Sequence, residues 1–215
     1  GYYFRNIKLT SPYPTQCSQS NQVIVGIGDH FTFDDIIVYN SGYDGIKTYG
    51  DCNSNTFPEN WKVINSEIYD CGLGCPASIV NGDGIDFTQC RNCVIENTII
   101  RDNMGHQLQI KLEAKNVSVI NSHFEGKHLF QLGLPGSVAQ CDTNNFNADS
   151  VIFIGNTIIA KGDTSEFVFK LADIHNLKIY NNTIVKDSIN SVNVGFICFG
   201  GCGGSSAWTN TPSGP

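Results

Sequence analysis

The sequence predicts an all-β fold, a right-handed parallel β-helix of about seven coils in which each coil lays its strands on those of the coil before it. Three observations indicate this fold. A frame made of a polar lead-in, a run of β-branched alternation and a closing Asn, Ser or Thr recurs along the 215 residues. A second short apolar strand follows most copies of that frame. Polar turns separate the strands, and the helical period of about 3.6 residues is missing.

The repeated frame supplies the first strand of each coil. A single copy cannot bury its apolar face alone, so successive coils must stack at the strand spacing of about 4.8 Å. The copies are FRNIKLTS from Phe4, FDDIIVYNS from Phe33, NWKVINSEI from Asn60, RNCVIENTII from Arg91, KNVSVINSHF from Lys115, DSVIFIGNTII from Asp149 and HNLKIYNNTIV from His175.

The second strands and the turns each predict a column of stacked side chains. Alternation points one side chain of every second strand into the core, and a short amide or hydroxyl in a turn can bond the same group one coil above. The inward column is expected at Ile46, Ile85, Leu108, Phe130, Phe167 and Phe196. The turn column is expected at Ser66, Asn97, Ser122, Asn156 and Asn182.

Segments that interrupt the period predict the loops and the domain organisation. Residues 11–22, 51–58 and 136–148 are rich in Ser, Asn, Pro, Gly and Cys, and they indicate loops that leave one edge of the rod. We assign residues 1–200 to one β-helix domain and residues 201–215 to a Gly- and Ser-rich tail or linker. The strand spacing also permits a two-sheet sandwich, although the repeated frame does not require one.

The composition indicates a polar but weakly charged surface. Charged residues are 15% of the chain and the net charge is −7, and Lys and Arg form no stripe that could follow a phosphate backbone, so nucleic acid is not an expected partner. No apolar run approaches the roughly 20 residues that cross a bilayer, and no signal segment opens the sequence. Nine cysteines beside a single Met predict an extracellular or cell-surface location.

The cysteines predict disulfides, and their odd number leaves at least one thiol free. Alternatively, the pair that begins at Cys71 and the CxxC that begins at Cys90 could form a four-thiolate zinc site, although strand residues three apart point to opposite faces. The sequons at Asn116 and Asn181 are candidate glycan acceptors. Proximity along the chain pairs Cys17 with Cys52, Cys71 with Cys75 and Cys198 with Cys202.

The densest patch of ionisable side chains lies on and around the second strands. Such a face suits a sugar polymer, a hard cation such as Ca²⁺ if Asp83 and Asp86 converge, or acid–base chemistry with His106 or Lys111 as the base. The outward column reads Lys47, Asp86, Gln109 and Gln131, preceded by Asp44, Asp83, His106 and His128 and followed by Tyr49, Thr88 and Lys111.

These residues define the candidate site. The alternative interpretation is that they only solvate one face of a sheet. No cofactor is expected, and Ca²⁺ at Asp83 and Asp86 is the candidate ion for this face. The candidate catalytic residues are Asp83, Asp86, His106, Lys111 and His128, and the candidate substrate-binding residues are Lys47, Tyr49, Gln109 and Gln131.

Three stretches, GDGIDF, NCVIENTIIRDN and KNVSVINSHFEGKHLFQLG, resemble the central coils of the pectate lyase family and of the wider pectin-lyase-like β-helix superfamily. The resemblance spans about a quarter of the chain, and it implies a parallel β-helix. It also implies that Asp83 or Asp86 matches the first calcium-binding acid and that Lys127 lies near the catalytic lysine. The sequence departs from the family at its next calcium-binding acids, where His106 and Gln109 stand, and no arginine follows Arg101.

These features favour a non-catalytic solenoid, either a structural subunit of a fibre or surface appendage or a carbohydrate-binding, adhesive module. The low charge, the cysteines and the missing catalytic arginine favour this interpretation. The alternative is a polysaccharide lyase or glycoside hydrolase that acts on an acidic polysaccharide, as the resemblance implies. The expected partners are a polysaccharide or another copy of the chain stacked head to tail.

Overall fold

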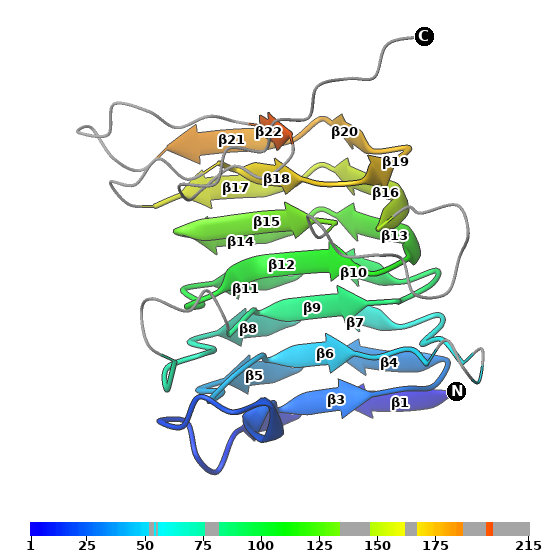
Figure 1. Ribbon diagram of the computed structural model, residues 1–215. Coiled ribbons are helices and arrows are strands. Elements are labelled where there is room, and N and C mark those ends of the chain that lie inside the picture. Colours follow the sequence, from blue (N-terminus) through cyan, green and yellow to red (C-terminus); the bar gives the residue numbers. More distant parts are fainter. Residues whose placement is uncertain are drawn as a thin grey trace, which may run out of the picture.

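The chain folds into a parallel β-helix, which confirms the predicted all-β class and the number of coils (Figure 1). The computed structural model describes residues 1–51, 54, 56–75, 82–133, 147–161, 167–186 and 197–199. Three parallel sheets run along the rod, and two of them contain seven strands each. Each coil therefore contributes a strand to every sheet. The helical structure of the described residues is a short 3-10 turn, η1 (Gln19–Asn21).

The strands follow one another from sheet A to sheet B to sheet C in every coil. Sheet A contains β1 (Tyr2–Arg5), β4 (Phe31–Asp34), β7 (Lys62–Ile64), β10 (Val94–Glu96), β13 (Ala114–Ile120), β16 (Ala148–Ile154), β19 (Ile174–His175) and β20 (Lys178–Tyr180). Sheet B contains β2 (Lys8–Thr10), β5 (Ile37–Tyr39), β8 (Glu67–Tyr69), β11 (Ile99–Arg101), β14 (His123–Gly126), β17 (Thr157–Ala160) and β21 (Thr183–Lys186). Sheet C contains β3 (Ile24–Gly26), β6 (Ile46–Thr48), β9 (Ile85–Thr88), β12 (His106–Lys111), β15 (His128–Leu132), β18 (Phe169–Leu171) and β22 (Ile197–Phe199).

The repeated frame folds as two strands rather than one, because the backbone bends sharply in its middle. The residue at the bend takes a left-handed conformation, with φ between 47° and 69° in all seven coils. Asn and Asp tolerate this conformation better than other residues with side chains, and Gly155 takes it without steric cost. The bend residues are Asn6, Asp35, Asn65, Asn97, Asn121, Gly155 and Asn181.

The inward column of sheet C is confirmed in its first four members and wrong in the next. Ile46, Ile85, Leu108 and Phe130 stand in register and are fully buried. Phe130 pairs with Phe169 rather than with Phe167, which lies two residues earlier and has the same strand parity. Phe196 lies outside the described residues, and Phe169 pairs with Ile197 in β22.

The turn column is confirmed except at one position, where Thr98 replaces Asn97. Thr98 Oγ1 accepts a hydrogen bond from Ser66 N at 3.4 Å, and Ser122 Oγ accepts one from Thr98 N at 3.2 Å. The ladder continues from Ser122 to Asn156 and from Asn156 to Asn182, at 2.9 Å in both steps. Asn97 is used for the left-handed bend instead, and its side chain donates to Asn65 Oδ1.

The loops do not leave one common edge, so this expectation was wrong. Residues 11–22 join β2 to β3 at the corner between sheets B and C, whereas residues 51–58 join β6 to β7 at the corner between sheets C and A. The segment between β8 and β9, at the corner between sheets B and C, was missed. Of residues 136–148, only the last two are described.

The cysteine pairing also differs from the expectation. Cys17 is bonded to Cys75, which ties the loop after β2 to the loop after β8 and rules out both the Cys17–Cys52 and the Cys71–Cys75 pairs. Cys71 is a free, buried thiol whose pKa is raised by burial. A disulfide joins Cys90 to Cys93, which contradicts the zinc alternative, and Cys198 is disulfide-bonded. Cys52 and Cys202 lie outside the described residues.

Candidate functional site

The outward face of sheet C carries the predicted polar column. Lys47 pairs with Asp86, Asp86 with Gln109, and Gln109 with Gln131 in the register of successive strands. The column was predictable because side chains of parallel strands in register stand directly above one another, and strict alternation identifies which of them face outward. Four successive coils therefore present a lysine, an aspartate and two glutamines along one line.

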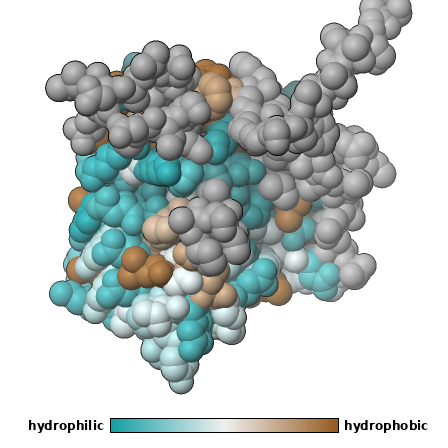
Figure 2. All heavy atoms as spheres, turned by 60° about the vertical axis from the view of Figure 1, so that its left-hand side comes forward, coloured by the Kyte–Doolittle hydropathy of each residue, from teal (hydrophilic) through white to brown (hydrophobic). Residues whose placement is uncertain are grey.

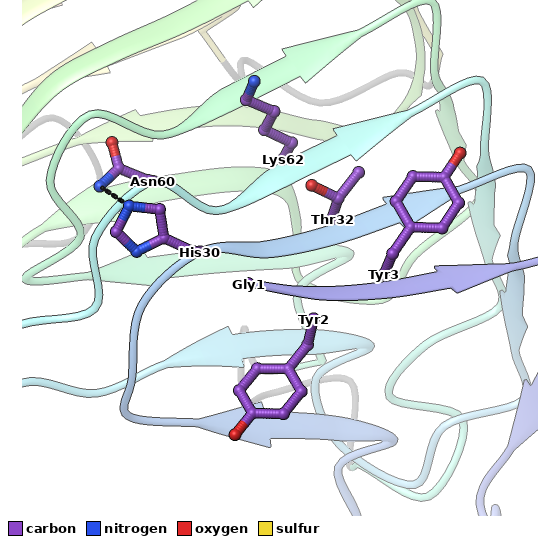
Figure 3. A pocket seen from close by; sticks show the side chains of 7 residues that line it. All are labelled: Gly1, Tyr2, Tyr3, His30, Thr32, Asn60 and Lys62. Atoms are coloured by element: carbon purple, nitrogen blue, oxygen red, sulfur yellow. Dashed lines mark hydrogen bonds between the residues drawn. The ribbon is translucent and has the colours of Figure 1, made fainter.

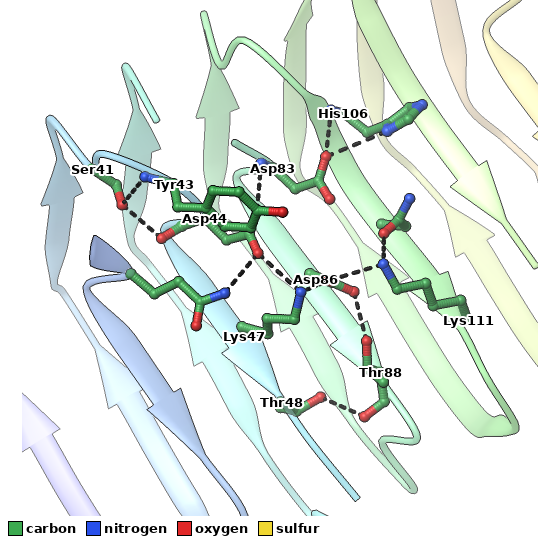
Figure 4. A network of polar contacts seen from close by, with 12 residues as sticks. Ser41, Tyr43, Asp44, Lys47, Thr48, Asp83, Asp86, Thr88, His106 and Lys111 are labelled. Carbon is green, nitrogen blue, oxygen red and sulfur yellow. Dashed lines mark hydrogen bonds and ion pairs between the residues drawn. The ribbon is translucent and has the colours of Figure 1, made fainter. Parts of the chain in front are cut away.

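Asp86 lies at the centre of this face and is fully buried. Its Oδ2 lies 2.6 Å from Lys47 Nζ and 3.0 Å from Lys111 Nζ, while its Oδ1 accepts a hydrogen bond from Thr88 Oγ1 at 2.9 Å (Figure 4). Burial alone would raise the pKa of Asp86, but the charges of Lys111 and Lys47 outweigh it, so the pKa is lowered. The carboxylate stays ionised and holds both ammonium groups.

Asp44 is the second buried carboxylate, just before β6. Its Oδ2 lies 3.1 Å from Lys47 Nζ and accepts from Gln22 Nε2 at 3.0 Å, and its Oδ1 accepts from the backbone N–H of Asp83 at 2.9 Å. Burial, followed by the negative charges of Asp83 and Asp86, raises the pKa of Asp44 to about 6. Lys47 opposes this shift only in part. The pKa values of two neighbouring carboxylates, Asp44 and Asp86, are thus shifted in opposite directions.

Asp83 and His106 form a pair at the start of β12. Asp83 Oδ1 accepts the backbone N–H of His106 at 2.6 Å and lies 3.3 Å from His106 Nδ1. The His106 side chain is only 5% exposed. Its Nε2 finds no hydrogen-bond partner among the described residues. The ring of His128 packs edge-on against the His106 ring, with the two centroids 6.0 Å apart.

These side chains surround a hollow of about 330 Å³, which we call the sheet C pocket. It lies where loops at the corner between sheets B and C approach the outward face of sheet C. Figure 2 brings this corner forward and shows a largely hydrophilic described surface with small hydrophobic spots. The pocket is lined by Gln19, Tyr43, Asp44, Lys47, Asp83, Asp86, His106, Gln109, Lys111 and Gln131.

The structure brings most of the predicted site residues together, and it adds two that were missed. Tyr49 and Thr88 support the pocket without lining it, since the Tyr49 ring lies 5.2 Å from Lys47 Nζ and Thr88 bonds Asp86. His128 lies behind His106. The missed residues are Gln19 and Tyr43, which come from the segments before β3 and β6. The polar composition of residues 11–22 hinted at Gln19, and no signal in the sequence pointed to Tyr43.

Asp83 and Asp86 are not arranged to share a cation. Asp83 is engaged by His106, and Asp86 is engaged by Lys47 and Lys111, so a divalent cation at Asp86 would meet two ammonium groups. Within the described ranges, no group of three or more His, Cys, Asp or Glu side chains could hold a metal ion. The residues present do not fit Ca²⁺.

A second hollow, of about 380 Å³, lies at the first coil (Figure 3). Tyr2 and Tyr3 point to opposite sides of β1, and Asn60 Nδ2 lies 3.3 Å from His30 Nε2. Among the described residues that line it, Lys62 is the only lysine or arginine, and there is no aspartate or glutamate. The hollow therefore lacks the paired ionisable groups of the sheet C pocket, and we do not assign it a function.

The comparisons with known proteins agree with this fold. Residues 56–207 match the family model described as a right handed beta helix region. No curated protein sequence matches the chain. The Dettilon tailspike protein superposes with a TM-score of 0.61 at 14% sequence identity, covering 86% of this chain and 39% of that one. The chain thus spans about two fifths of the tailspike protein's length.

Two enzymes superpose less closely. An alginate lyase from Paenibacillus gives a TM-score of 0.48 at 16% identity, covering 84% of this chain and 68% of that one. A pectate lyase gives a TM-score of 0.46 at 15% identity, covering 89% of this chain and 52% of that one. At these identities a structural likeness concerns the fold and not the activity.

Proposed function

The chain belongs to the right-handed β-helix family, and on that premise we propose that it is an extracellular or cell-surface solenoid that binds a saccharide chain in the sheet C pocket. The observation that carries the proposal is the pocket itself, a hollow of about 330 Å³ with a mostly polar lining. Its charged groups are fixed by one another in buried positions, so they are organised before a ligand arrives. Polar groups that converge in a preformed hollow are a feature of ligand sites.

The amide groups favour a sugar over other polar ligands. Gln19, Gln109 and Gln131 each offer both a donor and an acceptor, which matches a hydroxyl group that also donates and accepts. The outward column continues in register from Gln131 to Lys170 in β18. A polymer that lies along the rod would therefore meet a new outward side chain at each step of about 4.8 Å.

The disulfides support the proposed location. Cys17–Cys75 and Cys90–Cys93 require an oxidising compartment to persist. In the described part of the chain, no helix has the length and apolar character needed to cross a membrane. A secreted or surface-bound solenoid would meet polysaccharides there.

Self-association of the rod is a further part of this proposal. Tyr2 and Tyr3 in β1 are 63% and 60% exposed, and β1, β2 and β3 stand at one end of the strand order of the three sheets in the described residues. An open strand edge pairs readily with another strand. Head-to-tail stacking would appear in light scattering as species that grow with protein concentration, and a concentration-independent monomer would exclude it.

Glycoside hydrolysis is the second candidate function. It is favoured by two carboxylates whose pKa values are shifted in opposite directions. Asp44, with its pKa raised to about 6, suits a general acid, while Asp86 stays ionised. However, both oxygens of Asp86 are already engaged by Lys47, Lys111 and Thr88, which leaves it poorly placed as a base or nucleophile. We therefore rank binding above catalysis.

Binding and catalysis are separated by one set of measurements. We expect affinity electrophoresis or calorimetry against a panel of polysaccharides to find a ligand whose binding is weakened at least about tenfold by Gln109→Ala or Gln131→Ala. Thr157→Ala, an exposed change on sheet B, serves as the control and should leave binding unchanged. New reducing ends, or new absorbance from unsaturated products, in the same mixtures would instead establish an enzyme. Absence of binding across the panel would overturn the proposal.

A further inference from the structure

Both ammonium groups in the sheet C pocket are already held by aspartates. Lys47 Nζ lies within 3.1 Å of Asp44 Oδ2 and 2.6 Å of Asp86 Oδ2. Lys111 Nζ lies 3.0 Å from Asp86 Oδ2 and also donates to Gln109 Oε1. An ammonium group has three N–H donors, so each lysine keeps about one for a ligand. One N–H suffices for a hydroxyl group, but a ligand carboxylate would compete with buried aspartates that cannot leave.

The charge balance of the lining is unfavourable for an anion. Asp44, Asp83 and Asp86 supply three carboxylates against two ammonium groups, which leaves one net negative charge when the imidazole is neutral. No arginine is among the lining residues, so the bidentate group that best recognises carboxylates is missing from the described site. A ligand carboxylate would therefore enter a low-dielectric hollow against like charge.

His106 supplies an independent indication of a ligand. Its side chain is 5% exposed and lines the pocket, yet its Nε2 has no hydrogen-bond partner in the described part of the chain. A buried polar atom is rarely left without a partner. A hydroxyl group satisfies this nitrogen in either tautomer because it can donate or accept, whereas a carboxylate could only accept from a protonated nitrogen.

We propose, as an extension of the saccharide site proposed above, that the sheet C pocket selects a neutral saccharide and discriminates against polysaccharides made of uronic acids. Hydroxyl groups of the sugar bond the glutamine amides, the remaining lysine N–H groups and His106 Nε2. The proposal departs from the acidic polysaccharide that the pectate lyase resemblance implied. This selectivity follows because aspartates pair with both lysines. The pairing turns a face whose lysines could bind anions into one with a net negative charge.

Matched probes test this selectivity because a uronic acid differs from its parent sugar only at C6. Calorimetry would compare oligosaccharides of mannose, glucose and galactose with the corresponding mannuronate, glucuronate and galacturonate oligosaccharides of equal length. A buffer of about pH 8 keeps an ordinary imidazole neutral. We expect at least one neutral oligosaccharide to bind, and its uronate counterpart to bind at least about tenfold more weakly.

Substitution of the central aspartate should change the selectivity. Asp86→Asn releases both ammonium groups, so uronate binding should rise about tenfold and the preference for the neutral sugar should shrink or invert. Asp44→Asn releases Lys47 alone and should act in the same direction with a smaller gain. Asp35→Asn makes the same change of charge at an exposed bend residue remote from the pocket, and selectivity should not change.

The outcomes distinguish this inference from the function on which it rests. Uronate oligosaccharides that bind the unchanged protein as tightly as their neutral counterparts would overturn the inference and leave saccharide binding in place. No binding of any probe would overturn both. If circular dichroism shows that Asp86→Asn does not fold, Asp44→Asn carries the test, and an unchanged preference in that folded variant would contradict the proposed cause.

Discussion

Two faces of the same solenoid carry ladders of charged side chains, but they differ in burial. On sheet B, Arg101 lies 2.9 Å from both Glu67 and Asp102, and Lys161 bridges Asp102 to Glu125 across coils. The side chains of this ladder are 24% to 36% exposed. In the sheet C pocket the paired side chains of Asp44, Lys47, Asp86 and Lys111 are 0% to 14% exposed.

The difference shows what the loops add to a repetitive scaffold. Register alone places charges above one another on both sheets, and on sheet B they remain solvated ion pairs of small net value. On sheet C, loops that supply Gln19 and Tyr43 approach the strands and remove water from similar charges. Desolvated charges are costly unless they are fully paired. A buried charged cluster in a pocket therefore indicates function more strongly than an exposed one does.

The largest loss of stability should come from removing the carboxylate that pairs with both lysines. Asp86→Asn leaves two ammonium groups in a buried site without their main partner, and we expect the free energy of unfolding to fall by about 3 kcal/mol or more. Urea unfolding measures this loss. The matched change on sheet B, Glu67→Gln, should cost no more than about 1 kcal/mol. Equal losses in the two variants would contradict the distinction between the faces.

The disulfide that ties the corner loops should give the next largest effect. Cys17 and Cys75 are 58 residues apart, so replacing both with Ser releases a long loop in the unfolded chain and should cost about 2–4 kcal/mol. Cys90 and Cys93 are 3 residues apart, and the same double change there should cost clearly less. Thermal unfolding under non-reducing conditions compares the two. A larger loss at Cys90 and Cys93 would refute the loop-length argument.

Stability should depend on pH in opposite ways on the two faces. The pKa of Asp44 is raised to about 6 by burial and by Asp83 and Asp86, with Lys47 opposing and Tyr43 adjacent. Its contribution to stability is fully present below its unfolded pKa of about 4 and is lost as the pH rises through 6. The free energy of unfolding of the unchanged protein should therefore fall by about 2 kcal/mol between about pH 4 and pH 6 because of this group. In Asp44→Asn this fall should be absent.

Asp102 on sheet B should behave in the opposite way. Burial would raise its pKa, but Arg101 and Lys161 hold it below the usual value. Its contribution to stability is present at neutral pH and is lost as the pH falls below the ordinary range of an aspartate. Urea unfolding of Asp44→Asn and Asp102→Asn across a pH series that extends below about pH 4 measures both effects, and in Asp102→Asn the acid-dependent loss should be gone. The same sign of pH effect in both variants would contradict the assignment.

The smallest effect is expected at Arg101. Arg101→Met removes exposed ion pairs and the contact of the guanidinium group with the Tyr69 ring, 4.4 Å from its centroid. We expect a cost of about 1 kcal/mol at low salt and less at high salt, because exposed pairs are screened. Unfolding curves at two salt concentrations test this, with Lys178→Met as an exposed control. A cost that does not depend on salt would indicate packing rather than charge.

The sequence predicted the coils and the polar column because both depend on strict periodicity. Lys47, Asp86 and Gln109 could be aligned by strand parity alone. Phe167 was misplaced because Phe169 has the same parity and only the length of the preceding turn distinguishes them. Asn97 was misplaced because the left-handed bend requires Asn, which leaves Thr98 for the ladder.

Other features depend on tertiary contacts that no periodicity reports. Disulfide connectivity cannot be deduced from spacing, and Cys17 reaches Cys75 because two loops meet at one corner. The same meeting brings Gln19 to the pocket from a loop that the sequence indicated only by composition, and it brings Tyr43 from the segment before β6. The pairing of Lys47 with Asp44 and Asp86 follows from stacking together with burial, and burial was not visible in the sequence.

The stacked register also limits how this protein can change by gain or loss of whole coils. A repeat scaffold tolerates duplication of a unit because each unit contacts only its neighbours. A coil inserted between β6 and β9 would move Lys47 away from Asp86 by about 4.8 Å and destroy the pairing at the centre of the pocket. A coil inserted after β17 would lengthen the rod and leave that pairing intact. The polar column of sheet C thus divides the solenoid into two segments. In one the number of coils is constrained, and the other is free to vary in length during evolution.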